Sequence, residues 1–535
     1  MRSSMGSLMI VGVISICLMI NTCHAAKILF VPSNINSHVM FFSRLAVDLA
    51  QLGHVTTVLA TSSVRVPDFA ADGVERFTYV QYAVEGATPF LNSPEVSERL
   101  IAMAMTTSPL RRMKMIGELN VDVVRHGEQD CTELLDNDQL MQQVRNTGYD
   151  FAVMDLFSAI SCYYTLPYSL GIPYATMSLA LSSAHLFRVP RLAAFPNLVS
   201  LSDRPSFLDR LTAFVVERID PGVISDNAYF MKKYAPNRPM LDTTEIVRRQ
   251  SLWLFVEDIS VNYPLPQMPN TVAVGDIMAR AESRPLSGAV REFVSRSKNG
   301  VIVAAFGSFC DHFPPEITRR FCEAFTEVAK RFGLSVVWKL KAEDYCRNDD
   351  IFTSPWIPQK DLVSDSRVKL MISHGGHNSI VESVYHSKPL VVFPIGLDQP
   401  ANAAAAESKG FAIQMNIADF SSETLVANVE KLLTDPSYQH SAQLASAILR
   451  DRRDIPAERV SAMIDHVIKY GDRHLRTGAF GMSTLQFMMF DIFAALFVTA
   501  AVVFSAVMLF CYCAYRKCCR PPSHGTSSHI KPKSH

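Results

Sequence analysis

The residues best suited to chemistry lie within positions 356–399. A mostly apolar stretch at 368–372, predicted to be a buried strand, leads directly into the sequence SHGGHNS at 373–379. The paired glycines allow a tight turn and close approach of the backbone to a ligand, and Asn378 or Ser379 is expected to cap a following helix. Free N–H groups and the positive end of a helix dipole favour anions, so the arrangement predicts a phosphate site. It is neither the dinucleotide fingerprint nor a P-loop, since both glycine patterns are absent.

The residues on either side of this turn suit the other parts of a sugar nucleotide. The indole of Trp356 can stack on a nucleobase, and the amide of Gln359 can pair with a uracil edge. Glu382 lies one helical turn beyond the cap, where its carboxylate can accept hydrogen bonds from ribose hydroxyls. Asp398 and Gln399 offer acceptors and donors for the hydroxyls of a hexose. In order, these residues fit a base, a ribose, a diphosphate and a sugar.

Each of these residues also has a purely structural explanation. Ser379 and Glu382 form the pattern S-x-x-E of a capping box, which needs no ligand. Trp356 can be a core residue, and a single histidine such as His374 is often structural. The ordered set nevertheless resembles the signature of the UDP-glycosyltransferases, most closely the membrane-bound animal UDP-glucuronosyltransferases. The resemblance extends from the strand at Lys27 to the basic tail.

The resemblance implies an α/β protein of the GT-B fold, with two Rossmann-like domains facing a cleft and one C-terminal transmembrane helix. It implies inverting transfer of a hexose, with glucuronate expected, from a UDP-sugar to a small lipophilic acceptor, as in detoxification. The UDP-sugar is a co-substrate, and neither a cofactor nor a metal is implied. The UDP-sugar-binding residues implied by the resemblance are Ser308, Trp356, Gln359, His374, Gly376, Asn378, Ser379, Glu382, Asp398 and Gln399.

Two further residues follow strands in the N-terminal half. His38 comes after a predicted strand at 27–33, and Asp155 comes after a predicted strand at 149–154. Parallel sheets bind ligands at the carboxyl ends of their strands, although His38 can also simply cap a helix. The resemblance implies a catalytic dyad, in which His38 takes a proton from the acceptor and Asp155 orients the imidazole.

The sequence leaves the substrates open. Leu397 stands immediately before Asp398, where vertebrate members usually carry glycine or alanine, so the donor sugar cannot be assigned. A UDP-glucosyltransferase, a glycosyltransferase for a membrane lipid, and a non-catalytic membrane protein that binds lipophilic ligands remain alternatives. The resemblance also leaves open whether the chain forms a homo-oligomer.

Length and charge define the organisation of the chain. Its 535 residues suffice for two or three domains. The formal net charge is zero and no long basic run occurs outside the tail, which excludes nucleic acid as a partner. The expected parts are a signal peptide at 1–25, an acceptor-binding domain at 26–285, a UDP-sugar-binding domain at 286–450, a return helix and juxtamembrane segment at 451–491, a transmembrane helix at 492–515 and a cytosolic basic tail at 516–535.

Two apolar segments predict the route through the membrane. The run at 8–20 is too short to span a bilayer and fits a signal peptide, with an uncleaved anchor as the alternative. The uncharged stretch at 492–515 is long enough to span once, and Arg516 and Lys517 follow it. Positive flanks stay in the cytosol, so a single-pass type I protein with lumenal catalytic domains is predicted.

The tail and the cysteines carry weaker signals. Lys531 and Lys533 resemble a dilysine retrieval signal of the endoplasmic reticulum, although basic residues can occur there by chance. An acidic D-x-D pattern at 136–138 lies in a charged stretch, so no metal site is predicted. The odd, scattered set of lumenal cysteines predicts neither a disulfide framework nor a zinc site. These cysteines are Cys131, Cys162, Cys310, Cys322 and Cys346.

Overall fold

The structure is a computed structural model. It describes residues 25–67, 73–83, 93–106, 108–156, 162–178, 205–219, 228–264, 267–307, 313–341, 346, 348–452 and 455–518. The signal peptide up to residue 24, Ser308, Cys310 and the tail from Cys519, with both of its lysines, lie outside the described residues. The chain divides into two compact units, Met1–Arg476 and Thr477–His535.

The first unit begins with a seven-stranded parallel sheet of order β3-β2-β1-β4-β5-β6-β7. Every residue of β4 and β5 is buried, as expected for parallel strands covered by helices on both faces. In the central pair, Val31 of β1 lies opposite Met154 of β4, so the residues that follow these two strands are neighbours. The strands are β1 Lys27–Val31, β2 Val55–Thr61, β3 Phe77–Tyr82, β4 Phe151–Asp155, β5 Tyr174–Ser178, β6 Leu252–Phe255 and β7 Thr271–Ala273.

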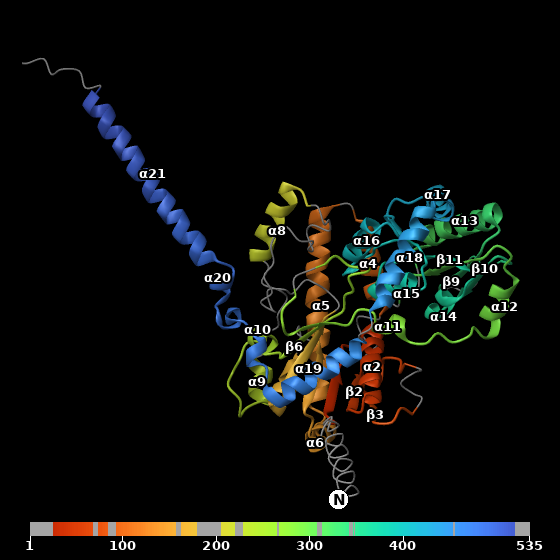
Figure 1. Cartoon of the computed structure of the whole chain (residues 1–535), viewed down its shortest axis with the longest axis horizontal. Helices are drawn as coiled ribbons and strands as arrows, with labels where there is room; N and C mark the ends of the chain where they lie inside the picture. The colour runs from red at the N-terminus through yellow and green to blue at the C-terminus, as the bar shows by residue number, and fades with distance from the viewer. Residues whose placement is uncertain are drawn as a thin grey trace, which may run out of the picture. The chain divides into compact units, whose positions relative to one another are not determined.

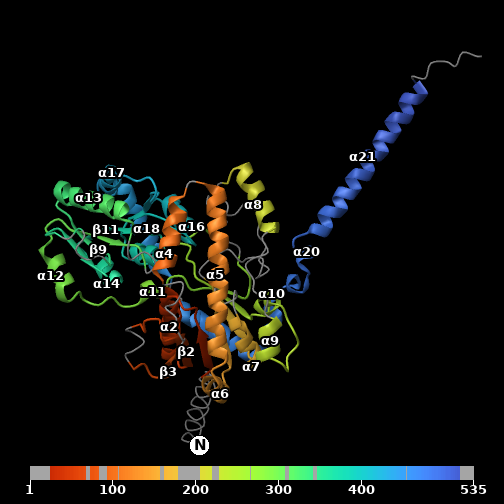
Figure 2. The same cartoon turned by 180° about the vertical axis from the view of Figure 1, so that it is seen from behind.

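Helices connect these strands, and the long helix α5 stands beside α4 (Figure 2). Leu100 and Ile101 of α4 belong to the same buried apolar cluster as Phe393 and Ile395 of the second sheet's domain. The first domain therefore reaches the second through α4. The helices are α2 Asn36–Gln51, α4 Pro94–Met105, α5 Pro109–Leu135, α6 Asp138–Thr147, the 3-10 helix η3 Cys162–Tyr164, α7 Thr165–Leu170, α8 Phe207–Ile219, α9 Ala228–Tyr234, α10 Thr243–Arg248 and α11 Ile277–Arg280.

A second parallel sheet has six strands in the order β10-β9-β8-β11-β12-β13. Its strands are β8 Val301–Ala305, β9 Ser335–Lys339, β10 Ile351–Ser354, β11 Val368–Ser373, β12 Leu390–Val392 and β13 Ala412–Gln414. Aromatic side chains fill its core, where Phe321 contacts the rings of Phe306, Trp338 and Phe393. The helices are α12 Gly288–Arg296, α13 Pro315–Phe332, α14 Gln359–Ser364, α15 His377–Tyr385, α16 Gln399–Ser408, α17 Ser422–Thr434 and α18 Pro436–Asp451.

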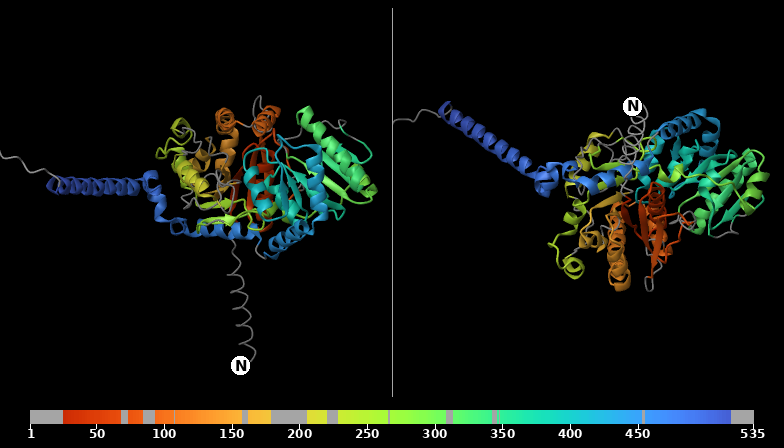
Figure 3. Two further views of the ribbon diagram at one scale, coloured as in Figure 1. Left: turned by 90° about the horizontal axis from the view of Figure 1, so that it is seen from above. Right: turned by 60° about the horizontal axis from the view of Figure 1, so that its bottom comes forward.

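After α18 the chain returns to the first sheet (Figures 1 and 3). Helix α19, Pro456–Tyr470, buries Val460 and Ile464 in the same apolar cluster as Phe30 of β1. Just before it, Arg452 forms an ion pair with the buried Asp258 of the first domain. The first unit ends near the 3-10 helix η5, Arg473–Leu475.

The odd, scattered set of lumenal cysteines left their disulfide pairing open, and the structure contains two pairs. Cys131 pairs with Cys162, and Cys322 pairs with Cys346, each with 5.7 Å between the Cα atoms. The first pair joins α5 to η3, and the second joins α13 to the segment that follows β9. Long-range packing brings these cysteines together, and their spacing along the chain gives no sign of it.

The second unit contains one long apolar helix, α21 Phe490–Cys518, preceded by η6 Gly478–Gly481 and α20 Thr484–Phe487. Its 29 residues have a mean hydropathy of 2.6 over the most apolar window. A helix of that length measures about 44 Å, which exceeds the roughly 30 Å of a bilayer core. Within the described part of the chain, α21 alone is long and apolar enough to cross a membrane.

Candidate active site

His38 and Asp155 meet at the carboxyl ends of β1 and β4. The Nδ1 atom of His38 lies 2.6 Å from Oδ2 of Asp155, and both side chains are buried. The backbone N–H of Ser33 donates a second hydrogen bond to the same oxygen, at 3.0 Å. Burial alone would raise the pKa of Asp155, but the charge of His38 and the hydrogen bonds from His38 and Ser33 outweigh it and lower the pKa. Asp155 is therefore an ionised partner for the imidazole.

His38 does not cap its helix. The N-cap of α2 is Ile35, without a side-chain hydrogen bond, and His38 lies inside the first turn. When Nδ1–H donates to a carboxylate, Nε2 is the basic nitrogen of the ring. The arrangement can therefore accept a proton at Nε2 and stabilise the resulting imidazolium through Asp155.

The turn between β11 and α15 differs from the prediction at its cap. The N-cap is Gly376, and Asn378 and Ser379 lie within the first turn of the helix, so neither of them caps it. The capping box with Glu382 is also absent, because the side chain of Ser379 accepts a hydrogen bond from Gln359 instead. With Gly375 at a φ of +85°, the glycines turn the strand directly into the helix. The first-turn N–H groups of a helix have no intrahelical acceptor and favour anions, so this turn can bind a phosphate as the sequence predicted.

Two glycines make room for His374. A Cβ atom added to Gly376 would lie 2.5 Å from Nε2 of His374, and one added to Gly307 would lie 2.6 Å from it. Burial, together with the positive charge of Lys339, lowers the pKa of His374 to about 4. A hydrogen bond with the backbone of Ala305 opposes this shift only in part, so the ring is neutral at physiological pH and its single N–H has a partner in β8.

Lys339 is a site residue that the sequence analysis missed. It ends β9, and its Nζ atom donates a hydrogen bond to the carbonyl of Gly307 at 2.9 Å. The same atom lies 5.0 Å from the ring centroid of Trp356. A charged residue at the carboxyl end of an otherwise apolar strand was the available signal, because this edge of a parallel sheet is where ligands bind.

The expected base and ribose residues form one cluster. Nε2 of Gln359 donates to Ser379 Oγ at 3.1 Å and to Glu382 Oε2 at 2.8 Å. Burial raises the pKa of Glu382 to about 7, and the hydrogen bond from Gln359 only partly opposes this. Trp356 is 49% exposed, which excludes the core explanation, and Arg65 of the first domain lies 4.7 Å above its ring.

Asp398 is the N-cap of helix α16, and Gln399 is the first residue of that helix. Asn402 donates to Asp398 Oδ2 at 2.6 Å and to the carbonyl of Gly375 at 3.1 Å, which joins this loop to the glycine turn. Burial raises the pKa of Asp398, while the hydrogen bond from Asn402 and the charge of His38 oppose the rise. The charge of His38, in the first domain, thus acts on Asp398, in the second domain.

Some expected features lie elsewhere. Ser308 is outside the described residues, so its position relative to the site is not assigned. The described residues contain no group of three or more His, Cys, Asp or Glu side chains that could hold a metal ion. Asp136, from the acidic D-x-D pattern, pairs instead with Lys233 and Tyr234.

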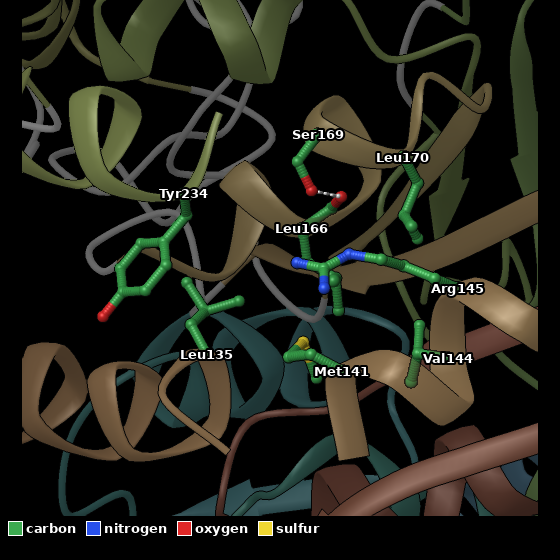
Figure 4. A pocket seen from close by; sticks show the side chains of 8 residues that line it. All are labelled: Leu135, Met141, Val144, Arg145, Leu166, Ser169, Leu170 and Tyr234. Carbon is green, nitrogen blue, oxygen red and sulfur yellow. Dashed lines mark hydrogen bonds between the residues drawn. The ribbon is translucent and has the colours of Figure 1, made fainter. Parts of the chain in front are cut away.

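A separate cavity lies in the first domain (Figure 4). Its volume is about 10 Å³, enough for about one water molecule and far below that of a small-molecule site. None of its lining residues belongs to the site described above. They are Leu135, Met141, Val144, Arg145, Leu166, Ser169, Leu170 and Tyr234.

Comparison with known proteins identifies the family. The family described as UDP-glucoronosyl and UDP-glucosyl transferase matches residues 26–523. The chain belongs to this family. It is 27% identical to the 2-hydroxyacylsphingosine 1-beta-galactosyltransferase of Mus musculus, over 93% of this chain and 90% of that one. It is 28% identical to the UDP-glucuronosyltransferase 2A3 of Cavia porcellus, over 92% of each chain. The protein is therefore a UDP-glycosyltransferase that uses a UDP-sugar as donor.

Solved structures establish the fold. The glycosyltransferase VinC, in complex with DTDP, matches with a TM-score of 0.57 at 15% identity, over 83% of this chain and all of that one. The glycotransferase of kitacinnamycin matches with a TM-score of 0.54 at 17% identity, over 83% and 100% of the two chains. The two facing parallel-sheet domains of the UDP-glycosyltransferase are thus those of the GT-B fold, as the sequence resemblance implied.

Replacing Gly376 by alanine should weaken UDP binding. The backbone at Gly376 has a φ of −60°, which alanine adopts freely, so the added methyl group acts through the contact with His374. Overpacking of this kind costs about 1–3 kcal/mol of folding stability. A turn displaced by the methyl group also loses hydrogen bonds to the charged diphosphate, so the affinity for UDP should fall by about 10-fold or more. Titration calorimetry with UDP measures the effect. Gly117→Ala on α5 is the control, since its added Cβ meets nothing within 4 Å. Equal UDP affinities of the two variants would contradict the proposed packing.

The raised pKa of Glu382 predicts a pH-dependent stability difference. The folded protein holds the proton of Glu382 up to a pH of about 7, whereas the unfolded chain releases it near its ordinary value of 4.5. The contribution of Glu382 to stability therefore falls as the pH rises from about 4.5 to about 7, and is level above. Glu382→Gln cannot ionise, so its melting temperature relative to the wild type should rise across this window.

Thermal melts at a series of pH values, with the donor absent, measure this difference. The exposed Glu292 provides the control, because Glu292→Gln should shift the melting temperature little at every pH. A constant difference between Glu382→Gln and the wild type from pH 5 to pH 8 would show that Glu382 is not desolvated as described.

Proposed function

We propose that the protein transfers a hexose from a UDP-sugar to a small lipophilic acceptor by a single inverting displacement, with His38 as the general base. The observation that supports this most directly is the buried pair of His38 and Asp155, 2.6 Å apart. The charge of His38 also reaches Asp398, in the loop expected to hold the sugar. A base on the acceptor side thus lies near the sugar side of the donor.

In this mechanism Nε2 of His38 takes the proton from the acceptor hydroxyl as its oxygen attacks the anomeric carbon. The bond from that carbon to the β-phosphate oxygen breaks, UDP leaves, and the configuration of the sugar inverts. Asp155 stabilises the imidazolium through Nδ1–H. Negative charge that grows on the diphosphate is met by the first-turn N–H groups of α15 and by Lys339, while His374 packs against Gly376 of the turn.

The remaining residues take the roles expected from the sequence. Trp356 and Gln359 hold the base, and Glu382 holds the ribose after its bond with Gln359 rearranges. The diphosphate is held at Gly376, Asn378 and Ser379, and the sugar hydroxyls by Asp398 and Gln399, with Ser308 beside the sugar nucleotide. Burial favours the roles of Ser379, Glu382 and Gln399, because hydrogen bonds in a desolvated site are stronger than the same bonds in water.

We expect glucuronate as the sugar, with glucose and galactose as alternatives. The relatives do not separate these donors, since a glucuronosyltransferase is 28% identical to the chain and a galactosyltransferase is 27% identical. A lipophilic acceptor is supported by the name of the latter relative, which acts on 2-hydroxyacylsphingosine, whereas the proposed role in detoxification rests on the sequence resemblance. A transferase for an endogenous membrane lipid is the second candidate for the same reason.

We also propose a type I protein of the endoplasmic reticulum membrane, with the catalytic domains in the lumen. Helix α21 provides the span, and Arg516 and Lys517 at its end favour a cytosolic C-terminus. The two disulfides support the same orientation, because disulfides persist in oxidising compartments such as the lumen and are rare in the cytosol.

Replacing His38 by alanine should affect acceptors unequally. The purified full-length protein would be offered UDP-glucuronate, UDP-glucose and UDP-galactose, each with an aliphatic alcohol or a carboxylic acid of similar size. An alcohol must lose its proton during attack, so its conjugation should fall about 10²–10⁴-fold in His38→Ala. A carboxylate is already ionised at neutral pH, so its conjugation should fall much less. UDP binding should be unchanged, because the nucleotide residues lie in the other domain.

The exposed His440 provides the control, since His440→Ala removes an imidazole from α18, which carries none of the proposed site residues. Equal losses for both acceptors, with UDP binding preserved, would assign His38 a positioning role instead of base catalysis. No turnover of any donor by the wild type would favour a non-catalytic lipophile-binding protein.

The proposed orientation predicts the pattern of proteolysis in sealed microsomes. Protease added outside should remove only the tail that follows Tyr515, and the catalytic domains should be cut only after the vesicles are opened with detergent. Immunoblotting with antibodies against each end distinguishes the fragments. Cleavage of intact vesicles within residues 26–480 would refute lumenal catalytic domains.

A further inference from the structure

The loop at residues 32–35, between β1 and α2, determines where the His38–Asp155 pair meets. Ser33 of this loop provides the N–H that donates to Asp155 at 3.0 Å, and His38 follows in the first turn of α2. The N-cap of that helix, Ile35, makes no side-chain hydrogen bond. An apolar N-cap lacks the side-chain acceptor that usually fixes the start of a helix. Contacts elsewhere in the loop therefore hold Ser33 and His38 in place.

Asn34 makes such contacts. It is 9% exposed, and its Nδ2 atom donates to Oδ2 of Asp130 on α5, 96 residues away, at 2.7 Å. Burial raises the pKa of Asp130, and the hydrogen bond from Asn34 opposes part of the rise. Asn34 also forms hydrogen bonds with Tyr82 and Tyr163, whose hydroxyl groups lie 3.0 Å apart. The side chain of one residue thus joins the loop to β3, α5 and η3.

Two of the elements that Asn34 contacts are also joined covalently. Cys131, the residue after Asp130, forms a disulfide with Cys162, the residue before Tyr163. Both cysteines are fully buried. Because the disulfide fixes α5 against η3, Asp130 and Tyr163 are held at a constant separation. The loop is therefore attached, through Asn34, to a rigid part of the first domain.

We propose that Asn34 is a positioning residue for the His38–Asp155 pair, and that its side chain holds the loop so that the N–H of Ser33 reaches the carboxylate of Asp155. This inference rests on the proposed role of His38 as the general base. Asn34 acts through its neighbour Ser33 and does not contact the substrate. Without the N–H of Ser33, Asp155 loses a hydrogen bond to its charged form and stabilises the imidazolium less.

The test compares Asn34→Ala with the full-length wild type, using the same alcohol and carboxylic acid acceptors as for His38→Ala. Conjugation of the alcohol should fall about 10-fold or more, as expected for the loss of one hydrogen bond to a charged group. Conjugation of the carboxylate should fall much less, because this acceptor needs no base. The affinity for UDP, measured by titration calorimetry, should be unchanged.

The pH profile provides a second measurement that a purely structural role would not alter. Against the effect of burial, the charge of His38 and the hydrogen bonds from His38 and Ser33 lower the pKa of Asp155. Loss of the Ser33 bond makes the carboxylate more basic, so the pair takes up its proton at higher pH. The acid limb of kcat/KM for the alcohol should therefore move to higher pH in Asn34→Ala.

Variants of Asp130 test the same contact from the other side. Asp130→Asn keeps an oxygen that accepts from Asn34, so its conjugation of the alcohol should stay close to that of the wild type. Asp130→Ala removes the acceptor and should reproduce the acceptor-dependent loss. The double variant Asn34→Ala/Asp130→Ala should be no slower than Asn34→Ala, because both changes break one contact. If Asn34→Ala does not fold, the comparison of Asp130→Asn with Asp130→Ala decides.

Asn299 provides a matched control. Its Nδ2 atom donates to the carbonyl of Phe332 at 2.9 Å, just before β8 and thus at the amino end of the second sheet. Asn299→Ala should change neither the preference between acceptors nor the pH profile. Equal losses for both acceptors in the Asn34 and Asp130 alanine variants, or an unshifted pH profile, would overturn the inference. Equal losses for both acceptors in His38→Ala would overturn the proposed function as well.

Discussion

The site depends on contacts between the two domains that are built on the two parallel sheets. The ion pair between Arg452 and Asp258 joins the segment after α18 to the first domain, and Asp258 is fully buried. Nε2 of His377, next to the glycine turn, contacts the carbonyl of Gly275 at 3.1 Å. Breaking a buried ion pair typically costs about 3–5 kcal/mol, because one charge is left without a partner. Such a pair therefore limits how far the facing edges can separate.

Burial then gives the same types of side chain different charges within one site. Burial raises the pKa of Glu382 and Asp398, whose hydrogen-bond partners are the neutral amides of Gln359 and Asn402. Asp155 is buried as deeply, yet its pKa is lowered, because His38 and a backbone N–H meet its charge. The carboxylate of Asp155, next to the proposed base, is thus ionised. The carboxyl group of Glu382, expected at the ribose, has a pKa of about 7. The ionisation of a buried carboxyl group in this site is therefore determined by the charge and hydrogen bonds of its neighbours, and not by whether the residue is Asp or Glu.

The sequence predicted the parts of this arrangement that follow from strand order. Asp155 ends β4, and His38 lies in the first turn of the helix that follows β1. The two strands are neighbours in one parallel sheet, so the proximity of the two residues follows once both strands are recognised. The glycine turn after β11 was found for a similar reason. The cap at Asn378 or Ser379 was predicted wrongly, because local propensity favours such caps and the side chain of Gln359, twenty positions earlier, takes Ser379 instead. The disulfides also depend on such distant packing.

Glycine is used in this site for two different physical reasons, and their comparison shows what sequence alone cannot reveal. Gly376 has an ordinary φ of −60° and is required for space, since His374 fills the volume of a side chain. Gly375 has a φ of +85° and is required for the backbone path. Leu397 adopts the second kind of conformation without being glycine. The two glycines can be recognised from the sequence as positions with a special backbone or packing requirement. Leu397 cannot, because its residue type gives no sign of its positive φ. A non-glycine residue with a positive φ adopts a conformation that its own residue type disfavours. The surrounding fold must therefore impose that conformation, and such a residue marks where the fold does so.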